Sequence, residues 1–60
     1  MSLNVLVLYE MADRASRVTT RKALREFEKW VLNTITLYKD ATIERMARSH
    51  LFRLKSQLAF

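Results

Sequence analysis

The chain has 60 residues, a formal net charge of +5, and no cysteine, glycine or proline. The missing cysteines exclude disulfides and thiolate metal sites, and the missing glycine and proline argue against tight hairpins, and so against β-sandwiches, barrels and doubly wound sheets. We therefore expect one all-α domain over residues 1–60, a helical hairpin or a small three-helix unit. Because a core this small supplies only roughly 3–5 kcal/mol and half the residues are apolar, we expect a dimer.

The first predicted element is a helix over about residues 3–18. Its apolar residues share one helical face at steps of three and four residues: Leu8, Met11, Ala12, Ala15 and Val18. Glu10 precedes Arg14 by four residues, and Asp13 precedes Arg17 by four. This order favours ion pairs along a helix and supports the helical prediction.

A β-strand over residues 3–9 is a minor alternative to the helix, because Val5 and Val7 favour extended backbone. An apolar run this short fits a helix or a strand. A lone strand here has only the same strand of a second chain to pair with, so the alternative is a sheet formed across a dimer.

The second predicted helix covers about residues 20–39. Its apolar arc is unusually wide and contains Ala23, Leu24, Phe27, Trp30, Val31, Thr34, Ile35, Leu37 and Tyr38. Arg25 and Lys29 lie opposite this arc. An arc this wide indicates two neighbouring helices, one of which could come from another chain. The apolar pattern slips near residues 18–20, which predicts a break there, with Thr19 or Thr20 as N-cap.

The third predicted helix covers about residues 41–59. Its core face contains Ile43, Ala47, His50, Leu51, Leu54 and Leu58. Asp40 is a suitable N-cap, and Glu44 precedes Arg48 by four residues. Because only one or two residues separate this helix from the second, the two should form an antiparallel hairpin.

The excess positive charge lies on the last two predicted helices. Residues 1–20 carry two basic and two acidic side chains, residues 21–39 five and two, and residues 40–60 four and two. A basic helical face neutralises phosphates. The candidate nucleic-acid-binding residues are Arg21, Arg25, Lys29, Arg45, Arg48 and Lys55. Phe52, an aromatic residue well outside the core face and among these cations, has the chemistry to stack on a base.

The apolar surface supports a second hypothesis, a protein-interaction module such as an adaptor, an inhibitor or a small subunit of a complex. Aromatic and large aliphatic side chains are the usual anchors of such interfaces. The candidate interface residues are Phe27, Trp30, Val31, Leu37, Phe52, Leu58 and Phe60. A membrane-surface helix fits less well, because the polar faces carry charges of both signs.

The chain shows no pattern typical of an enzyme. His50 is its one histidine, without a nucleophile and an orienting acid at suitable spacing or companion metal ligands. No phosphate-binding turn is possible without glycine. We expect no catalytic residue, no cofactor and no metal.

The sequence thus predicts a non-catalytic, basic, helical protein that acts as an oligomer in association with nucleic acid, with the protein-interaction module as the alternative. No signal peptide or transmembrane segment is expected in residues 1–60, so a cytoplasmic location is the default.

Overall fold

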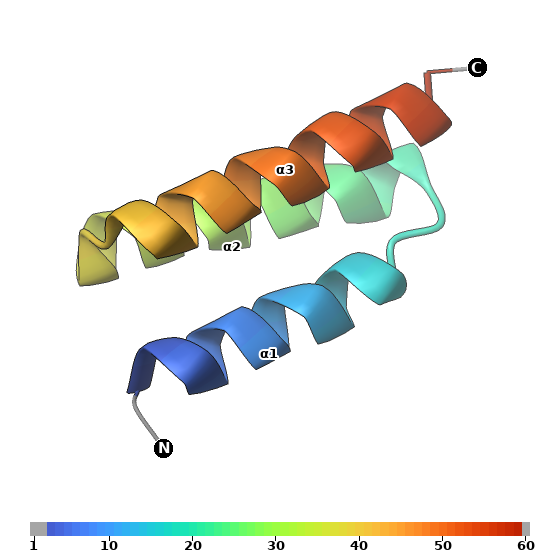
Figure 1. The fold of residues 1–60 in the computed structure, drawn as a ribbon. Coiled ribbons are helices and arrows are strands. Elements are labelled where there is room, and N and C mark those ends of the chain that lie inside the picture. The colour runs from blue at the N-terminus through green and yellow to red at the C-terminus, as the bar shows by residue number, and fades with distance from the viewer. Residues whose placement is uncertain (1–2, 60) are drawn as a thin grey trace.

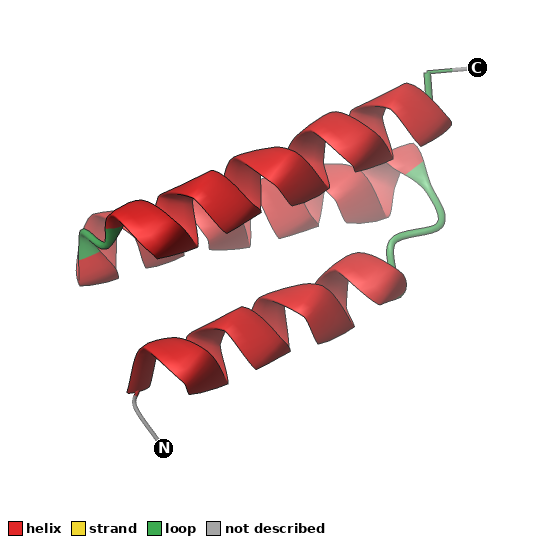
Figure 2. Ribbon diagram, viewed as in Figure 1, coloured by secondary structure: helices red, strands yellow, loops and turns green. Residues whose placement is uncertain are grey.

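The computed structural model describes residues 3–59, which form three α-helices (Figure 1). Helix α1 spans Leu3–Ser16, α2 spans Arg21–Tyr38 and α3 spans Ala41–Gln57. Figure 2 shows short loops and no strand among these residues. The all-α three-helix prediction is confirmed, and each helix end lies within two residues of its predicted position. The dimer and the strand that would pair across it concern a second chain and stay predictions.

The helices run alternately up and down along a body of 37 × 18 × 16 Å (Figure 1). The α1–α2 connection and the end of α3 lie at one end of the bundle, and the start of α1 and the α2–α3 turn lie at the other. Helix α3 packs against both other helices, whereas α1 and α2 contact each other least. The seam between α1 and α2 is therefore the most open part of the fold.

The break between α1 and α2 falls at residues 17–20, where the apolar pattern slips. Thr20 is the N-cap of α2, and its hydroxyl oxygen accepts a hydrogen bond from the backbone N–H of Ala23 at 3.0 Å. At the other end of α2, Lys39 takes the left-handed conformation with φ 47° and ψ 45°. Glycine is the usual residue at such a C-cap, so in this glycine-free chain a residue with a Cβ occupies it.

Asp40 both begins α3 and holds α1 in place. Its Oδ1 accepts hydrogen bonds from the backbone N–H groups of Thr42 at 2.8 Å and Ile43 at 3.0 Å, which confirms the predicted N-cap. Its Oδ2 accepts a hydrogen bond from Asn4 Nδ2 at 2.7 Å. The first turns of α1 and α3 are thus joined by one carboxylate.

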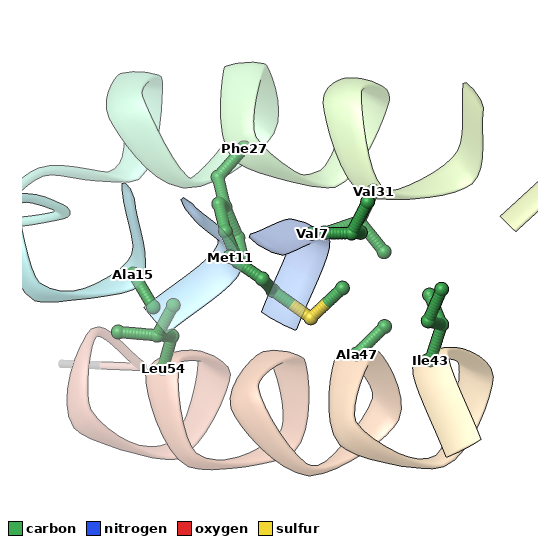
Figure 3. Close-up of a cluster of buried hydrophobic side chains, with 8 residues drawn as sticks. All are labelled: Val7, Met11, Ala15, Phe27, Val31, Ile43, Ala47 and Leu54. Carbon is green, nitrogen blue, oxygen red and sulfur yellow. The ribbon is translucent and has the colours of Figure 1, made fainter. Parts of the chain in front are cut away.

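The core is one cluster to which all three helices contribute (Figure 3). Its buried members are Val7, Met11, Ala15, Phe27, Val31, Ile43, Ala47 and Leu54. Figure 3 shows Met11 of α1 reaching between α2 and α3, near the middle of the cluster. The buried hydroxyl of Thr34 donates to the backbone oxygen of Trp30 at 2.8 Å, so this polar group is satisfied.

One core prediction needs correction. In α1 the buried face runs through Val7, Met11 and Ala15, while the predicted Ala12 is exposed, because α1 packs mainly on α3. The wide apolar arc of α2 extends beyond the core of this chain, and Leu37, a candidate interface residue, is exposed near the helix end. The sequence pattern of either helix alone does not reveal the weak contact between α1 and α2.

Candidate nucleic-acid interface

The charges are distributed unevenly between the two ends of the bundle. We call residues 10–29 and 49–59 the basic half, since they carry eight basic and four acidic side chains. Residues 3–9 and 30–48, the apolar half, carry three basic and two acidic side chains. The described chain therefore has a charge of +4 at the end with the α1–α2 connection and +1 at the other.

Arg21, one of the six predicted cations, is occupied within the fold. Its Nε donates to the backbone oxygen of Leu58 at 3.0 Å, and its Nη2 donates to that of Ala59 at 3.2 Å. These carbonyls follow the last turn of α3, where backbone oxygens have no helical partner and a cation is favourable. Arg21 thus ties the start of α2 to the end of α3.

Two more predicted cations form exposed ion pairs. Arg48 lies 2.6 Å from Glu44 on α3, as the sequence spacing predicts. Lys55 of α3 lies 2.8 Å from Glu28 of α2 and so links two helices. Because exposed ion pairs contribute little free energy, about 0–1 kcal/mol, a phosphate could compete for either cation.

The other three predicted cations have no such partner. Arg25, Lys29 and Arg45 form no hydrogen bond or ion pair with any of residues 3–59, and neither does Lys22, which the sequence analysis missed. Lys22, Arg25 and Lys29 are three and four residues apart on the exposed face of α2; we call them the basic stripe. Arg45 lies on α3 in the apolar half, away from the stripe. The three- and four-residue spacing was the signal that would have identified Lys22.

The basic stripe is long enough to contact several phosphates of a nucleic acid. Seven residues of helix separate Lys22 from Lys29, which is about 10 Å at 1.5 Å per residue. One strand of duplex DNA carries one phosphate per about 3.4 Å of helix axis, so the stripe spans about three phosphates. Its cations are exposed and free to move toward them.

Three predicted interface residues are used within the chain. Phe27 and Val31 belong to the buried core. Trp30 is half-buried and stacks on Phe27 with ring centroids 6.2 Å apart, and the guanidinium carbon of Arg14 lies 4.6 Å from the Trp30 centroid. This cation–π contact places the guanidinium over one face of the tryptophan ring. Phe27, Val31 and Trp30 therefore all make contacts within the fold.

The remaining predicted interface residues are spread over the surface. Leu37 of α2 and Phe52 of α3 are exposed, and Leu58 is half-buried at the C-cap of α3. Phe60 lies outside the described residues. Phe52 follows Arg48 by four residues and precedes Lys55 by three, so the exposed ring shares a helical face with two cations, as predicted.

His50 lies beside Arg53 on α3. Arg53 Nη2 is 3.0 Å from His50 Nδ1. Since a guanidinium has only donors, Nδ1 must be the acceptor, and this requires the neutral imidazole. Partial burial, and secondly the charge of Arg53, lower the pKa of His50 from its ordinary value of 6.5.

We expect the free energy of unfolding to fall as the pH is lowered through 6.5, because the unfolded chain binds a proton more readily at His50 than the folded chain does. The contribution is fully present above pH 6.5 and is lost as the pH falls through the lower folded-state pKa. Urea denaturation followed by far-UV circular dichroism at pH 7.5 and at lower pH measures this loss. His50→Gln should lose less stability over the same interval; an equal loss in both proteins would contradict the assignment.

Residues 3–59 contain no group of three or more histidine and acidic side chains that could hold a metal ion.

A hollow of about 410 Å³ between α1 and α2 is lined by three carboxylates and by the two arginines Arg14 and Arg17. Arg14 lies 3.6 Å from Glu10 and Arg17 lies 3.1 Å from Asp13, so the predicted ion pairs are present.

Within the described range, every helix is too short or too polar to cross a bilayer.

No protein family, curated protein or solved structure matches this chain.

Proposed function

We propose that the protein binds nucleic acid without catalysing a reaction, and that the basic stripe on α2 makes the main contact with the phosphate backbone. The observation that carries the proposal is that Lys22, Arg25 and Lys29 share one exposed helical face and have no hydrogen-bond or ion-pair partner within residues 3–59. They lie in the half of the bundle that holds most of the net positive charge. With such a partner, we expect a regulatory role in the cytoplasm.

Phosphate contacts of this kind position a protein without reading the base sequence. Lys55 and Arg48 are secondary candidates, because a phosphate can replace their half-buried carboxylate partners in ion pairs near the surface. Phe52 lies between them along α3 and offers a stacking surface for an unpaired base. The proposal therefore covers both duplex DNA and single-stranded RNA, because both offer a phosphate backbone to the basic stripe.

The test is a titration of fluorescently labelled random-sequence duplex DNA and single-stranded RNA, read by anisotropy over a series of salt concentrations. For duplex DNA the logarithm of the binding constant should fall with the logarithm of salt by about 0.9 per phosphate contact. Replacing Lys22, Arg25 and Lys29 together with glutamine should weaken binding at low salt and reduce that slope by about 3.

The matched control removes the same three charges elsewhere, through Arg17→Gln, Lys39→Gln and Arg53→Gln. These residues come from three different parts of the fold and lie off the stripe. The control should keep most of the salt slope. Absence of binding by the parent protein at low salt, or an equal loss in the control, would reject the basic stripe as a nucleic-acid interface.

The second candidate, a protein-interaction module, is favoured by the exposed apolar side chains of the opposite half. If the parent protein fails to bind either nucleic acid, this candidate takes first place, and the cations then serve solubility.

A further inference from the structure

The exposed apolar side chains are gathered in the half of the bundle that carries little net charge. Among residues 3–59, eight of the nine large exposed hydrophobic residues lie in the apolar half: Leu3, Val5, Leu6, Tyr9, Leu32, Leu37, Tyr38 and Met46. The ninth is Phe52 in the basic half. Single exposed hydrophobic residues are ordinary, but a concentration of them marks an interaction surface.

This half contains a hollow of about 310 Å³ between the start of α1 and the end of α2. We call it the α1–α2 groove. Buried Val7 and Thr34 lie among its lining, and it is flanked by Leu3, Leu6 and Leu37, which are 60%, 53% and 70% exposed. The groove lies between the two helices that contact each other least.

We propose that a second copy of this chain docks on the α1–α2 groove and forms a two-fold dimer, in which leucines of each copy enter the groove of the other. A two-fold interface needs a surface that complements itself. The groove meets this condition, because the same surface carries exposed leucines and the hollow that would receive them.

The charge distribution favours the apolar half over the basic half as the place where a second copy docks. Two basic halves, at +4 each, repel one another, whereas the apolar halves carry +1 each and the groove has one charged residue in its lining, Glu10. Docking through the groove therefore keeps the like charges apart. It also leaves the basic stripe on α2 exposed, so this proposal does not depend on nucleic-acid binding.

The interface would occupy a modest share of the molecular surface. A stable interface buries about 800 Å² on each partner, which is about a sixth of the chain's surface of 4634 Å². The second copy would also add apolar burial to a core with only eight buried hydrophobic members among the described residues. Small folds without disulfides or metals often gain stability in this way.

Sedimentation equilibrium of the full chain over a wide concentration range tests the proposal. The parent protein should dimerise, and Leu6→Asn and Leu37→Asn should each weaken dimerisation about 30-fold or more, as truncation of an interface anchor does. The matched control is Leu32→Asn, since Leu32 is also an exposed leucine of α2, at 58%, but does not line the groove. The control should dimerise like the parent.

Cysteine cross-linking provides a second test that leaves most of the groove intact, because the chain has no cysteine of its own. Under oxidising conditions Leu37→Cys should form a disulfide-linked dimer, and Leu32→Cys should form much less. A parent protein that remains monomeric would overturn the proposal and assign the groove to another protein. Equal weakening by Leu32→Asn, or preferential cross-linking at position 32, would overturn it in favour of a different dimer face.

Discussion

Replacing Met11 with alanine should lower the free energy of unfolding by about 2–5 kcal/mol, the usual range for truncating a large buried side chain. Met11 is 0% exposed and reaches from α1 between α2 and α3 (Figure 3). The substitution leaves a cavity where all three helices meet. Since a domain of this size has only about 3–5 kcal/mol of stability from its core, we expect the Met11→Ala protein to lose most of its stability in water at 25 °C.

The chain supplies a matched control in Met46, a methionine on α3 that is 41% exposed. Met46→Ala should change the free energy of unfolding by less than about 1 kcal/mol, because little contact is lost. Urea denaturation followed by far-UV circular dichroism compares the two proteins. Equal destabilisation by both substitutions would contradict the packing of α1 around Met11.

Replacing Asp40 with alanine should lower the free energy of unfolding by about 1–3.5 kcal/mol, because one side chain has two roles. Loss of the α3 N-cap costs about 0.5–2 kcal/mol, and loss of the hydrogen bond from Asn4 costs about 0.5–1.5 kcal/mol. The same denaturation experiment measures the total. The first turns of α1 and α3 should both fray, which amide hydrogen exchange would detect near residues 4 and 42.

Two further variants separate the roles of Asp40. Asp40→Ser keeps a good N-cap residue but shortens the side chain that reaches Asn4. Asn4→Ala removes the link and leaves the cap. If the link is real, Asp40→Ala should cost less in the Asn4→Ala background than in the parent protein; strictly additive costs would exclude coupling between the two residues.

The features that sequence analysis predicted correctly are those that depend on neighbours along the chain. The caps at Thr20 and Asp40 and the break before α2 are fixed by residues within one helical turn. The same holds for the pair of Glu44 and Arg48. Local patterns suffice for such features because their partners lie three or four residues away.

Features that depend on distant partners were not predictable in this way. Arg21 has the appearance of a solvent-exposed cation in the sequence, yet it bonds to carbonyls 37 and 38 residues further on. Trp30 has the appearance of an interface anchor, yet Arg14 covers its ring. In each case the deciding contact joins two helices, and the pattern of one helix does not specify how its neighbour is rotated.

The candidate site was predictable in part. Arg25 and Lys29 were predicted from the charge opposite the apolar arc of α2, and Lys22 is found only by following that face toward the helix start. The sequence does not indicate which cations are already paired, since the contact of Lys55 with Glu28 spans two helices. The division into a basic and an apolar half also depends on the up-and-down arrangement of the helices (Figure 1).

That division has a consequence for how the molecule meets a charged partner. At physiological ionic strength electrostatic forces are screened over about 8 Å, which is much shorter than the 37 Å length of the bundle. A polyanion at one end is therefore almost insensitive to the charge at the other. If the proposed binding holds, the local field would steer the encounter, and the bundle would approach a polyanion with the α1–α2 connection foremost and fastest in dilute salt.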